Sequence, residues 1–176
     1  IYKIIDTPTG NDYIEMSAKS FEEISPQRKY HGISTQIIAQ IKNVRVPFNV
    51  DIGVGDIIVP RAEERAINTQ LPDFEAPVIK TYSLESTIAE KFDAILQRFE
   101  LTGRMKDFYD IYYLSRTFDF DGMKLQSAVF ETLQRRETPY DKDSFERVIT
   151  LADNEDIKKR WRYFLRTIKD DTLEFS

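Results

Sequence analysis

The sequence predicts an α+β fold in which β-strands come first and helices follow. Two runs rich in β-branched residues, HGISTQIIAQI at 31–41 and VRVPFNVDI at 44–52, are typical of strands and are joined by a two-residue KN turn. After residue 83, apolar residues recur with helical spacing in several successive segments. We therefore expect an antiparallel or mixed sheet within 1–80 and a separate helical domain over 81–176.

The segment FNVDIGVGD at 48–56 places a carboxylate in the middle of a predicted strand. The even positions of 44–54 are all apolar, whereas Asp51 shares the odd positions with Arg45 and Asn49. Because successive side chains point to opposite faces of a strand, we expect Asp51 on an open, polar face. The two glycines that follow it leave room for another group to approach the backbone. Such a carboxylate is a solvated surface residue, a calcium ligand or part of a catalytic metal site.

The rest of the chain divides into a loop and a series of helices. Residues 60–80 contain three prolines and no clear period, which predicts a loop. Ser83 is a candidate N-cap for the helix that follows, and Gly103 separates this helix from a second one at 104–116. Further helices are predicted at about 121–135, 143–152 and 155–170.

The composition excludes several kinds of chemistry. The chain has no cysteine and a single histidine, His31, so disulfides, thiolate zinc sites, cysteine nucleophiles and multi-histidine metal sites are excluded, as is most Ser–His catalysis. Any reaction must therefore use carboxylates, lysine, arginine and hydroxyl groups. The sequence has no apolar run long enough for a transmembrane helix and no signal-peptide pattern, which favours a soluble, cytoplasmic protein.

The charge distribution is uneven along the chain. A formal net charge of −5 argues against a nucleic-acid footprint over the whole surface. Six basic residues nevertheless fall within one short segment at 158–169. Such a run is most often a solvated helix face, with Trp161 and Phe164 packed inward. Its functional alternative is a surface that contacts a phosphate backbone.

The helix predicted after Ser83 carries charged residues beside its apolar face. Glu85 falls inside the apolar arc, and Lys91 lies on the flank of this arc, aligned with Arg98 two turns later. Burying an unpaired carboxylate is costly, so Glu85 must be paired or neutralised. A structural pair with Arg98 or Lys91 is the simpler explanation, and a functional role is the other.

The second helix, RMKDFYDIYYLS at 104–115, is apolar nearly all round, which predicts a central, buried helix. Its charged residues would then be costly. Lys106 and Asp110 are spaced as a simple i,i+4 pair. Asp107 follows Arg104 by three residues, and it either anchors Arg104 or serves as a functional group at a cleft.

Three motifs occur in order along the chain: VDIGVGD at 50–56, YSLESTIAEKFDAILQR at 82–98 and GRMKDFYDIYYL at 103–114. Together they resemble the AbiEii/AbiGii toxin-type nucleotidyltransferases, which belong to the DNA polymerase β-like nucleotidyltransferase superfamily. In addition, VFETLQRRETP at 129–139 and WRYFL at 161–165 resemble the C-terminal helices of this family. The likeness therefore extends over about 30–170.

The resemblance implies a reaction and a set of partners. Members of the family transfer a nucleotide from an NTP to a hydroxyl, with magnesium held by carboxylates, and in some the acceptor is the 3′ end of tRNA. Others are linked to phage-triggered growth arrest, or abortive infection, beside a cognate antitoxin. We accordingly expect an NTP, Mg²⁺, an antitoxin and, through the basic segment at 158–169, tRNA as partners, and no membrane.

The resemblance also implies roles for individual residues. Asp51 corresponds to a carboxylate of the catalytic metal site, Lys91 to a lysine that contacts the triphosphate, and Asp107 to the catalytic acid of the last motif. Nucleotide binding is expected from Lys91, Arg98, Arg104 and Lys106. Glu85 and Asp110 are expected to orient these side chains without contacting the nucleotide themselves.

The first motif of the family, a Gly-Ser or Gly-Gly turn followed by a D-x-D strand, does not occur before Asp51. In the family this motif supplies two of the three metal carboxylates. We therefore expect this chain, which begins at Ile1, to be a fragment that is inactive alone. Two alternatives remain: a non-catalytic module that binds a partner or RNA, and a structural α+β domain whose acids are solvated.

Overall fold

The computed structural model describes residues 1–7, 13–24, 32–55, 57–170 and 172–175. The chain divides into two compact units, Ile1–Asp56 and Ile57–Ser176. The first unit is mainly a β-sheet and the second is mainly helical, so the predicted α+β fold is confirmed. The predicted division into domains over 1–80 and 81–176 stays a prediction.

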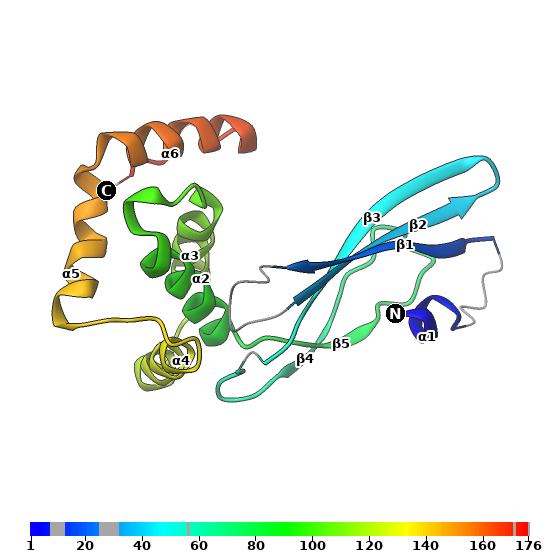
Figure 1. Cartoon of the computed structure of the whole chain (residues 1–176), viewed down its shortest axis with the longest axis horizontal. Coiled ribbons are helices and arrows are strands. Elements are labelled where there is room, and N and C mark those ends of the chain that lie inside the picture. Colours follow the sequence, from blue (N-terminus) through cyan, green and yellow to red (C-terminus); the bar gives the residue numbers. More distant parts are fainter. Residues whose placement is uncertain (8–12, 25–31, 56, 171, 176) are drawn as a thin grey trace. The chain divides into compact units, whose positions relative to one another are not determined.

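The first unit contains an antiparallel sheet with the strand order β1–β2–β3 (Figure 1). Its strands are β1 (Glu15–Ile24), β2 (Gly32–Ile41) and β3 (Val44–Gly53), and the short helix α1 (Tyr2–Ile5) contacts β1. The predicted KN turn joins β2 to β3, with Lys42 at a positive φ of 52°. The predicted hairpin is therefore confirmed.

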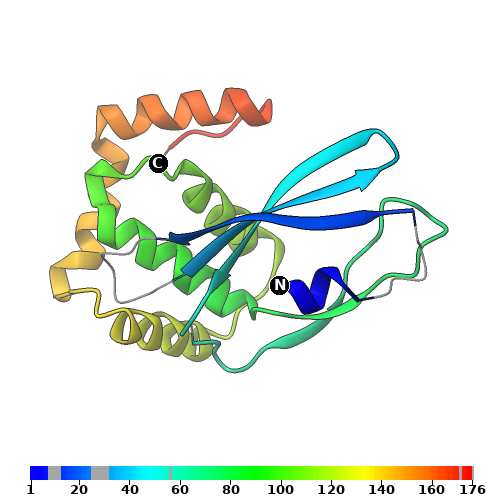
Figure 2. The same ribbon diagram turned by 45° about the vertical axis from the view of Figure 1, so that its right-hand side comes forward.

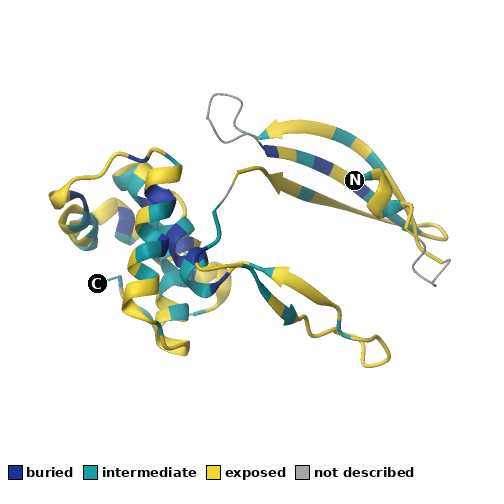
Figure 3. Cartoon of the chain, turned by 90° about the horizontal axis from the view of Figure 1, so that it is seen from below, coloured by how far each residue is buried: buried dark blue, intermediate teal, exposed yellow. Residues whose placement is uncertain are grey.

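The cross-strand register gives this sheet one polar and one apolar face. On the polar face Asp51 pairs with Ser34, and Asn49 pairs with Gln36. The expected position of Asp51 on a polar, open face is therefore confirmed. The opposite face carries the even-numbered residues of β3, which are mostly exposed, whereas the buried residues of the sheet lie on β2 (Figure 3).

The second unit begins with a two-stranded antiparallel hairpin, formed by β4 (Glu63–Ala66) and β5 (Val78–Thr81). The prediction of a loop over 60–80 is wrong at these two strands. Glu63 pairs with Thr81, whose Oγ1 donates to the Glu63 carbonyl oxygen at 3.1 Å. The EERA sequence of β4 has no β-branched residue, so its extended conformation depends on pairing with the distant β5 rather than on its own propensity.

Five α-helices follow among the described residues of the second unit: α2 (Leu84–Arg98), α3 (Met105–Thr117), α4 (Gly122–Arg135), α5 (Lys142–Thr150) and α6 (Glu155–Ile168). Ser83 caps α2 as predicted, because its Oγ accepts a hydrogen bond from the Ser86 backbone N–H at 3.1 Å. The same Oγ donates to the Val59 carbonyl oxygen at 2.5 Å, which attaches the start of α2 to the preceding segment. None of the described helices is long and apolar enough to cross a membrane.

The helices share two apolar cores, and α2 contacts both α3 and α4 (Figure 2). Where α2 meets α4, the small side chains of Ala89 and Ala128 are fully buried and allow the two helices to pack closely. The larger core joins α2, α3 and α6, and its buried members are Ile95, Met105, Leu151, Ile157, Trp161 and Leu165.

The helix α3 is less buried than its sequence predicts. Its fully buried residues are Met105 and Asp107, whereas Tyr112 and Tyr113 in its C-terminal half are exposed. The prediction of a buried, central helix is therefore wrong for this half. Tyrosine tolerates such a position because its hydroxyl group can remain in water. Of the charged residues near the start of the helix, Arg104 and Lys106 are exposed and Asp107 is buried.

Candidate nucleotide site

Charged side chains predicted from the sequence meet where α2 contacts α3. Lys91 projects from α2, and its Nζ donates to Asp110 Oδ2 at 2.6 Å. It also lies 3.5 Å from Asp107 Oδ1. Asp107 and Asp110 are three residues apart on α3, so both carboxylates lie on the side of this helix that meets Lys91. The structure thus brings together two separate motifs of the sequence.

Two further cations of α3 complete this cluster. Arg104 donates through Nε to Asp107 Oδ2 and through Nη2 to Asp107 Oδ1 at 3.3 Å. Lys106 Nζ donates to Asp110 Oδ2 at 2.6 Å. Three basic side chains therefore surround two acidic ones, and this cluster of Lys91, Arg104, Lys106, Asp107 and Asp110, which we call the α2–α3 cluster, carries an excess of positive charge.

Burial differs sharply within the α2–α3 cluster. The Asp107 side chain is 3% exposed, whereas the side chain of its partner Arg104 is 53% exposed. Lys91 and Asp110 lie between these extremes, at 19% and 20%. A buried carboxylate is tolerated only when it is paired and hydrogen-bonded, and both conditions hold for Asp107. Asp107 is therefore an internal anchor, while Arg104 and Lys106 are exposed and Lys91 is partly exposed.

The ionisation of Asp110 follows from its surroundings. Partial burial raises the pKa of this carboxyl, but hydrogen bonds from Lys106 and Lys91, together with their positive charges, outweigh that effect. The pKa of Asp110 therefore lies below its ordinary value. Asp110 stays ionised near neutral pH and holds the ammonium groups of both lysines.

The structure does not test the roles expected of Glu85 and Arg98. Glu85 lies in the first turn of α2 and is half-buried, and within the described part of the chain its side chain forms no hydrogen bond or ion pair. Arg98 is the last residue of α2, two turns beyond Lys91. The expected roles of Glu85 in orienting Lys91 or Arg98, and of Arg98 in binding the nucleotide, stay predictions.

The predicted metal ligand Asp51 belongs to the first unit. It is exposed, and its Oδ1 accepts a hydrogen bond from Ser34 Oγ at 2.6 Å. Asp56, at the other end of the same motif, lies outside the described residues. Among the described residues no three His, Cys, Asp or Glu side chains are grouped so that they could hold a metal ion. Asp51 alone does not form a metal site, because Mg²⁺ requires several oxygen ligands.

One buried acid was missed by sequence reasoning. Asp93 of α2 is fully buried, accepts a hydrogen bond from Thr138 Oγ1, and accepts another from Gln97 Nε2 at 2.9 Å. It also pairs with Arg136 Nη1 at 3.0 Å, while Arg136 Nη2 reaches Glu90 at 2.6 Å. No local spacing marks this network, because Arg136 and Thr138 lie more than forty residues from Asp93.

Comparison with known proteins places the chain in a family. A model of the family described as "Nucleotidyl transferase AbiEii toxin, Type IV TA system" matches residues 1–175. The chain therefore belongs to the AbiEii nucleotidyltransferase toxin family, as the resemblance of its motifs indicates. No curated protein matches the chain. Membership implies a nucleotide substrate and an antitoxin partner, and nucleotidyltransferases of this kind generally use divalent metal ions.

Proposed function

We propose that this chain provides the nucleotide-holding part of a magnesium-dependent nucleotidyltransferase toxin that modifies RNA. The observation that carries the proposal is Lys91, whose ammonium group is held 2.6 Å from Asp110 at the partly exposed contact of α2 with α3. The triphosphate of an NTP has several negative charges, and a fixed ammonium group beside two further cations suits such a ligand.

In this proposal the members of the α2–α3 cluster have different tasks. Lys91 contacts the triphosphate, and Arg104 and Lys106 add positive charge around it. Asp107 holds Arg104 and stays buried, and Asp110 keeps Lys91 extended before the nucleotide binds. During transfer the acceptor oxygen bonds to the α-phosphorus, the bond from that phosphorus to the bridging oxygen breaks, and pyrophosphate leaves. The hydroxyl proton passes to solvent.

The metal ion would be Mg²⁺, with Asp51 as one of its ligands. The carboxylate of Asp51 is exposed on the polar face of its sheet, next to the hydroxyl group of Ser34. A bound magnesium ion would supply positive charge to the phosphates. Because Asp51 is a single carboxylate, other oxygen ligands must join it, and we assign them no positions.

The proposal also names the RNA acceptor and the cellular role of the protein. The basic segment at 158–169 forms most of α6 in a chain whose net charge is −5, which supports tRNA as the acceptor. We further propose that the protein acts in the cytoplasm, in phage defence by abortive infection, and that its cognate antitoxin restrains it.

A transfer assay tests this proposal. The chain is expressed from its complete reading frame and incubated with each labelled NTP in turn, Mg²⁺ and total tRNA. We expect label in the RNA fraction, with no transfer in Asp51→Ala and full transfer in Asn49→Ala, a control on the same face of β3. Absence of transfer with every NTP would contradict the proposal. Label found in the protein fraction would show that the acceptor is a protein and not RNA.

The second candidate is a non-catalytic module that binds RNA or a protein partner. The observation that favours it is the exposed basic surface of α6, which can bind without any reaction. If the chain is such a module, charge reversal within 158–169 should abolish its binding of the partner, and Asp51→Ala should leave this binding unchanged. The transfer assay therefore separates the two candidates.

A further inference from the structure

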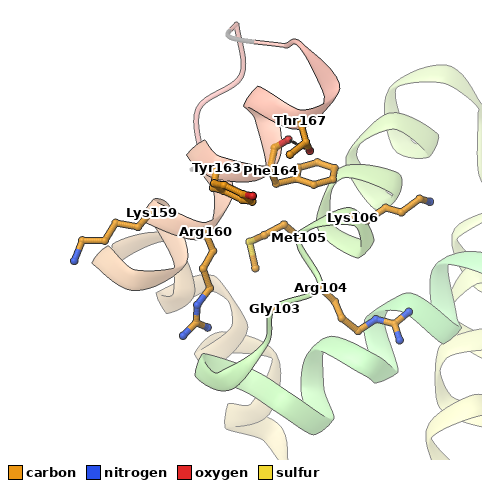
Figure 4. A pocket seen from close by; sticks show the side chains of 9 residues that line it. All are labelled: Gly103, Arg104, Met105, Lys106, Lys159, Arg160, Tyr163, Phe164 and Thr167. Carbon is orange, nitrogen blue, oxygen red and sulfur yellow. Dashed lines mark hydrogen bonds between the residues drawn. The ribbon is translucent and has the colours of Figure 1, made fainter.

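A pocket lies between the start of α3 and one side of α6 (Figure 4). It has a volume of about 480 Å³, which falls in the range of small-ligand pockets. Its lining comes from residues 103–106 before and within α3, and from Lys159, Arg160, Tyr163, Phe164 and Thr167 of α6. The pocket lies beside the α2–α3 cluster, because Arg104 and Lys106 belong to both.

The middle of the pocket is apolar and firmly supported. Met105 is buried in the larger core, and Phe164 packs against the rings of Trp161 and Tyr109 at centroid distances of 5.7 Å and 5.8 Å. Tyr163 differs from these residues because it is 71% exposed and in ring contact with none of the described aromatic residues. Its ring therefore offers an open aromatic surface beside a rigid apolar floor.

The rim of the pocket is cationic and contains no acidic residue. Arg160 donates through Nη1 to the carbonyl oxygens of Glu100 and Thr102, at 2.9 Å and 2.8 Å, so its position is fixed while its charge is not cancelled by an acid. Lys159 pairs with Asp156 at 3.3 Å. Both of these side chains are exposed, and such surface pairs are weak enough for Lys159 to exchange partners.

Positive charge continues from the pocket along the exposed side of α6. Three residues of this helix lie three, four and seven positions after Lys159, namely Arg162, Tyr163 and Arg166. This spacing places all four side chains on one face of the helix. Arg166 forms no side-chain hydrogen bond or ion pair within the described residues, and Arg162 acts on Glu155 only through its charge. Cations that lack local partners remain available to a ligand with regularly spaced negative charges.

We propose that this pocket binds one unpaired nucleotide of a single-stranded RNA segment. The base stacks on Tyr163 above the apolar floor, and the phosphates on either side contact Lys159, Arg162 and Arg166. An aromatic ring that accepts a base beside a row of cations is the arrangement with which proteins hold single strands. This inference rests on the proposed function, since it assigns to the RNA acceptor a position next to the α2–α3 cluster.

The pocket and the α2–α3 cluster are linked through two side chains. Arg104 and Lys106 extend away from Tyr163 (Figure 4). Arg104 donates to Asp107, and Lys106 donates to Asp110. A strand that places one nucleotide against Tyr163 therefore continues past these two cations. The pocket selects single-stranded RNA because the bases of a duplex are paired and stacked on each other and cannot reach the ring.

The test measures binding of RNA to the full chain without NTP and without Mg²⁺. Fluorescence anisotropy gives the affinity for a short labelled single-stranded RNA, for its duplex, and for the same strand with abasic positions. We expect Tyr163→Ala to weaken binding of the intact strand roughly fivefold to hundredfold, since base stacking contributes in this range, and Tyr163→Trp to retain it. The duplex is expected to bind more weakly than the single strand.

A double-mutant cycle sharpens this test. If the base stacks on Tyr163, removing the base and replacing Tyr163 by alanine abolish the same contact. The abasic strand should then bind Tyr163→Ala about as tightly as it binds the wild type. Lys159→Glu weakens binding of every strand, whereas Lys142→Glu, which makes the same charge change on exposed α5, leaves it unchanged. Tyr163 is exposed, so its replacement is not expected to disturb folding.

Two results would overturn the inference. If Lys159→Glu weakens binding and Tyr163→Ala does not, α6 attracts RNA by charge alone and the pocket takes no base. If neither variant changes RNA binding, this surface faces another ligand, such as a protein. Both outcomes are read without nucleotide transfer, so they are distinguishable from a failure of the proposed reaction.

Discussion

Lys91 Nζ lies 2.6 Å from Asp110 Oδ2, and this contact ties α2 to α3 at the candidate nucleotide site. The same oxygen accepts a hydrogen bond from Lys106 at 2.6 Å. One carboxylate therefore holds two ammonium groups and fixes the position of the Lys91 ammonium group. A phosphate that binds Lys91 competes with a carboxylate that is shared between two cations.

The first prediction concerns the pH dependence of stability. Because the folded state lowers the pKa of Asp110 below 3.8, its contacts stabilise the protein above this pH and are lost as the pH falls through the folded pKa. Asp110→Asn lacks them at every pH. The difference in Tm between wild type and Asp110→Asn should be largest near neutral pH and shrink below about pH 4.

Thermal unfolding of both proteins across this pH range makes the measurement. The lowered pKa values of Asp141, Glu155 and Asp170 are common to both proteins and cancel in the difference. A difference in Tm that is the same at acidic and neutral pH would show that the charge of Asp110 contributes nothing to folding.

The second prediction concerns Arg104 and the buried carboxylate of Asp107. Arg104→Ala leaves Asp107 with Lys91 at 3.5 Å as its remaining cation. We expect a loss of about 1–3 kcal/mol in the free energy of unfolding, because a buried acceptor loses its charged partner. Arg116→Ala, an exposed arginine of the same helix, should change it by less than about 0.5 kcal/mol. Urea unfolding followed by circular dichroism compares the two, and equal effects would refute the anchoring role of Asp107.

The third prediction concerns the network around Asp93. Arg136→Met leaves this fully buried carboxylate without its cation, which should lower the free energy of unfolding by about 3–5 kcal/mol. Thr138→Val removes one hydrogen bond and should cost about 1–3 kcal/mol. Arg166→Met makes the matched change at an exposed position and should be nearly neutral. Equal stability of Arg136→Met and Arg166→Met would show that the contact between Arg136 and Asp93 does not stabilise the fold.

Much of the helical part could be predicted because its signals are local. Ser83 caps α2 through a residue three positions away, and the pairs Arg104–Asp107 and Lys106–Asp110 each lie within about one helical turn. These contacts follow from the spacing of residues alone. The helix boundaries and the two pairs that α3 contributes to the α2–α3 cluster were therefore accessible from the sequence.

The remaining features depend on contacts between distant segments. The strand β4 forms only by pairing with β5, and Asp93 is buried by residues that follow α4. Sequence reasoning assigned Asp107 the catalytic role and gave Asp110 a supporting one, whereas Asp110 makes the shorter contact with Lys91. Which acid a lysine reaches depends on how two helices are rotated against each other, and periodicity does not supply this angle.

The proposed contact between Lys91 and the triphosphate can be tested by equilibrium binding of NTP. The dissociation constant is measured for wild type, Lys91→Met and Lys124→Met, an exposed lysine of α4 that serves as the control. We expect Lys91→Met to weaken NTP binding roughly tenfold to hundredfold, the range expected for one charged hydrogen bond, at unchanged helical content. Binding by Lys91→Met that equals that of wild type and Lys124→Met would contradict the proposed contact.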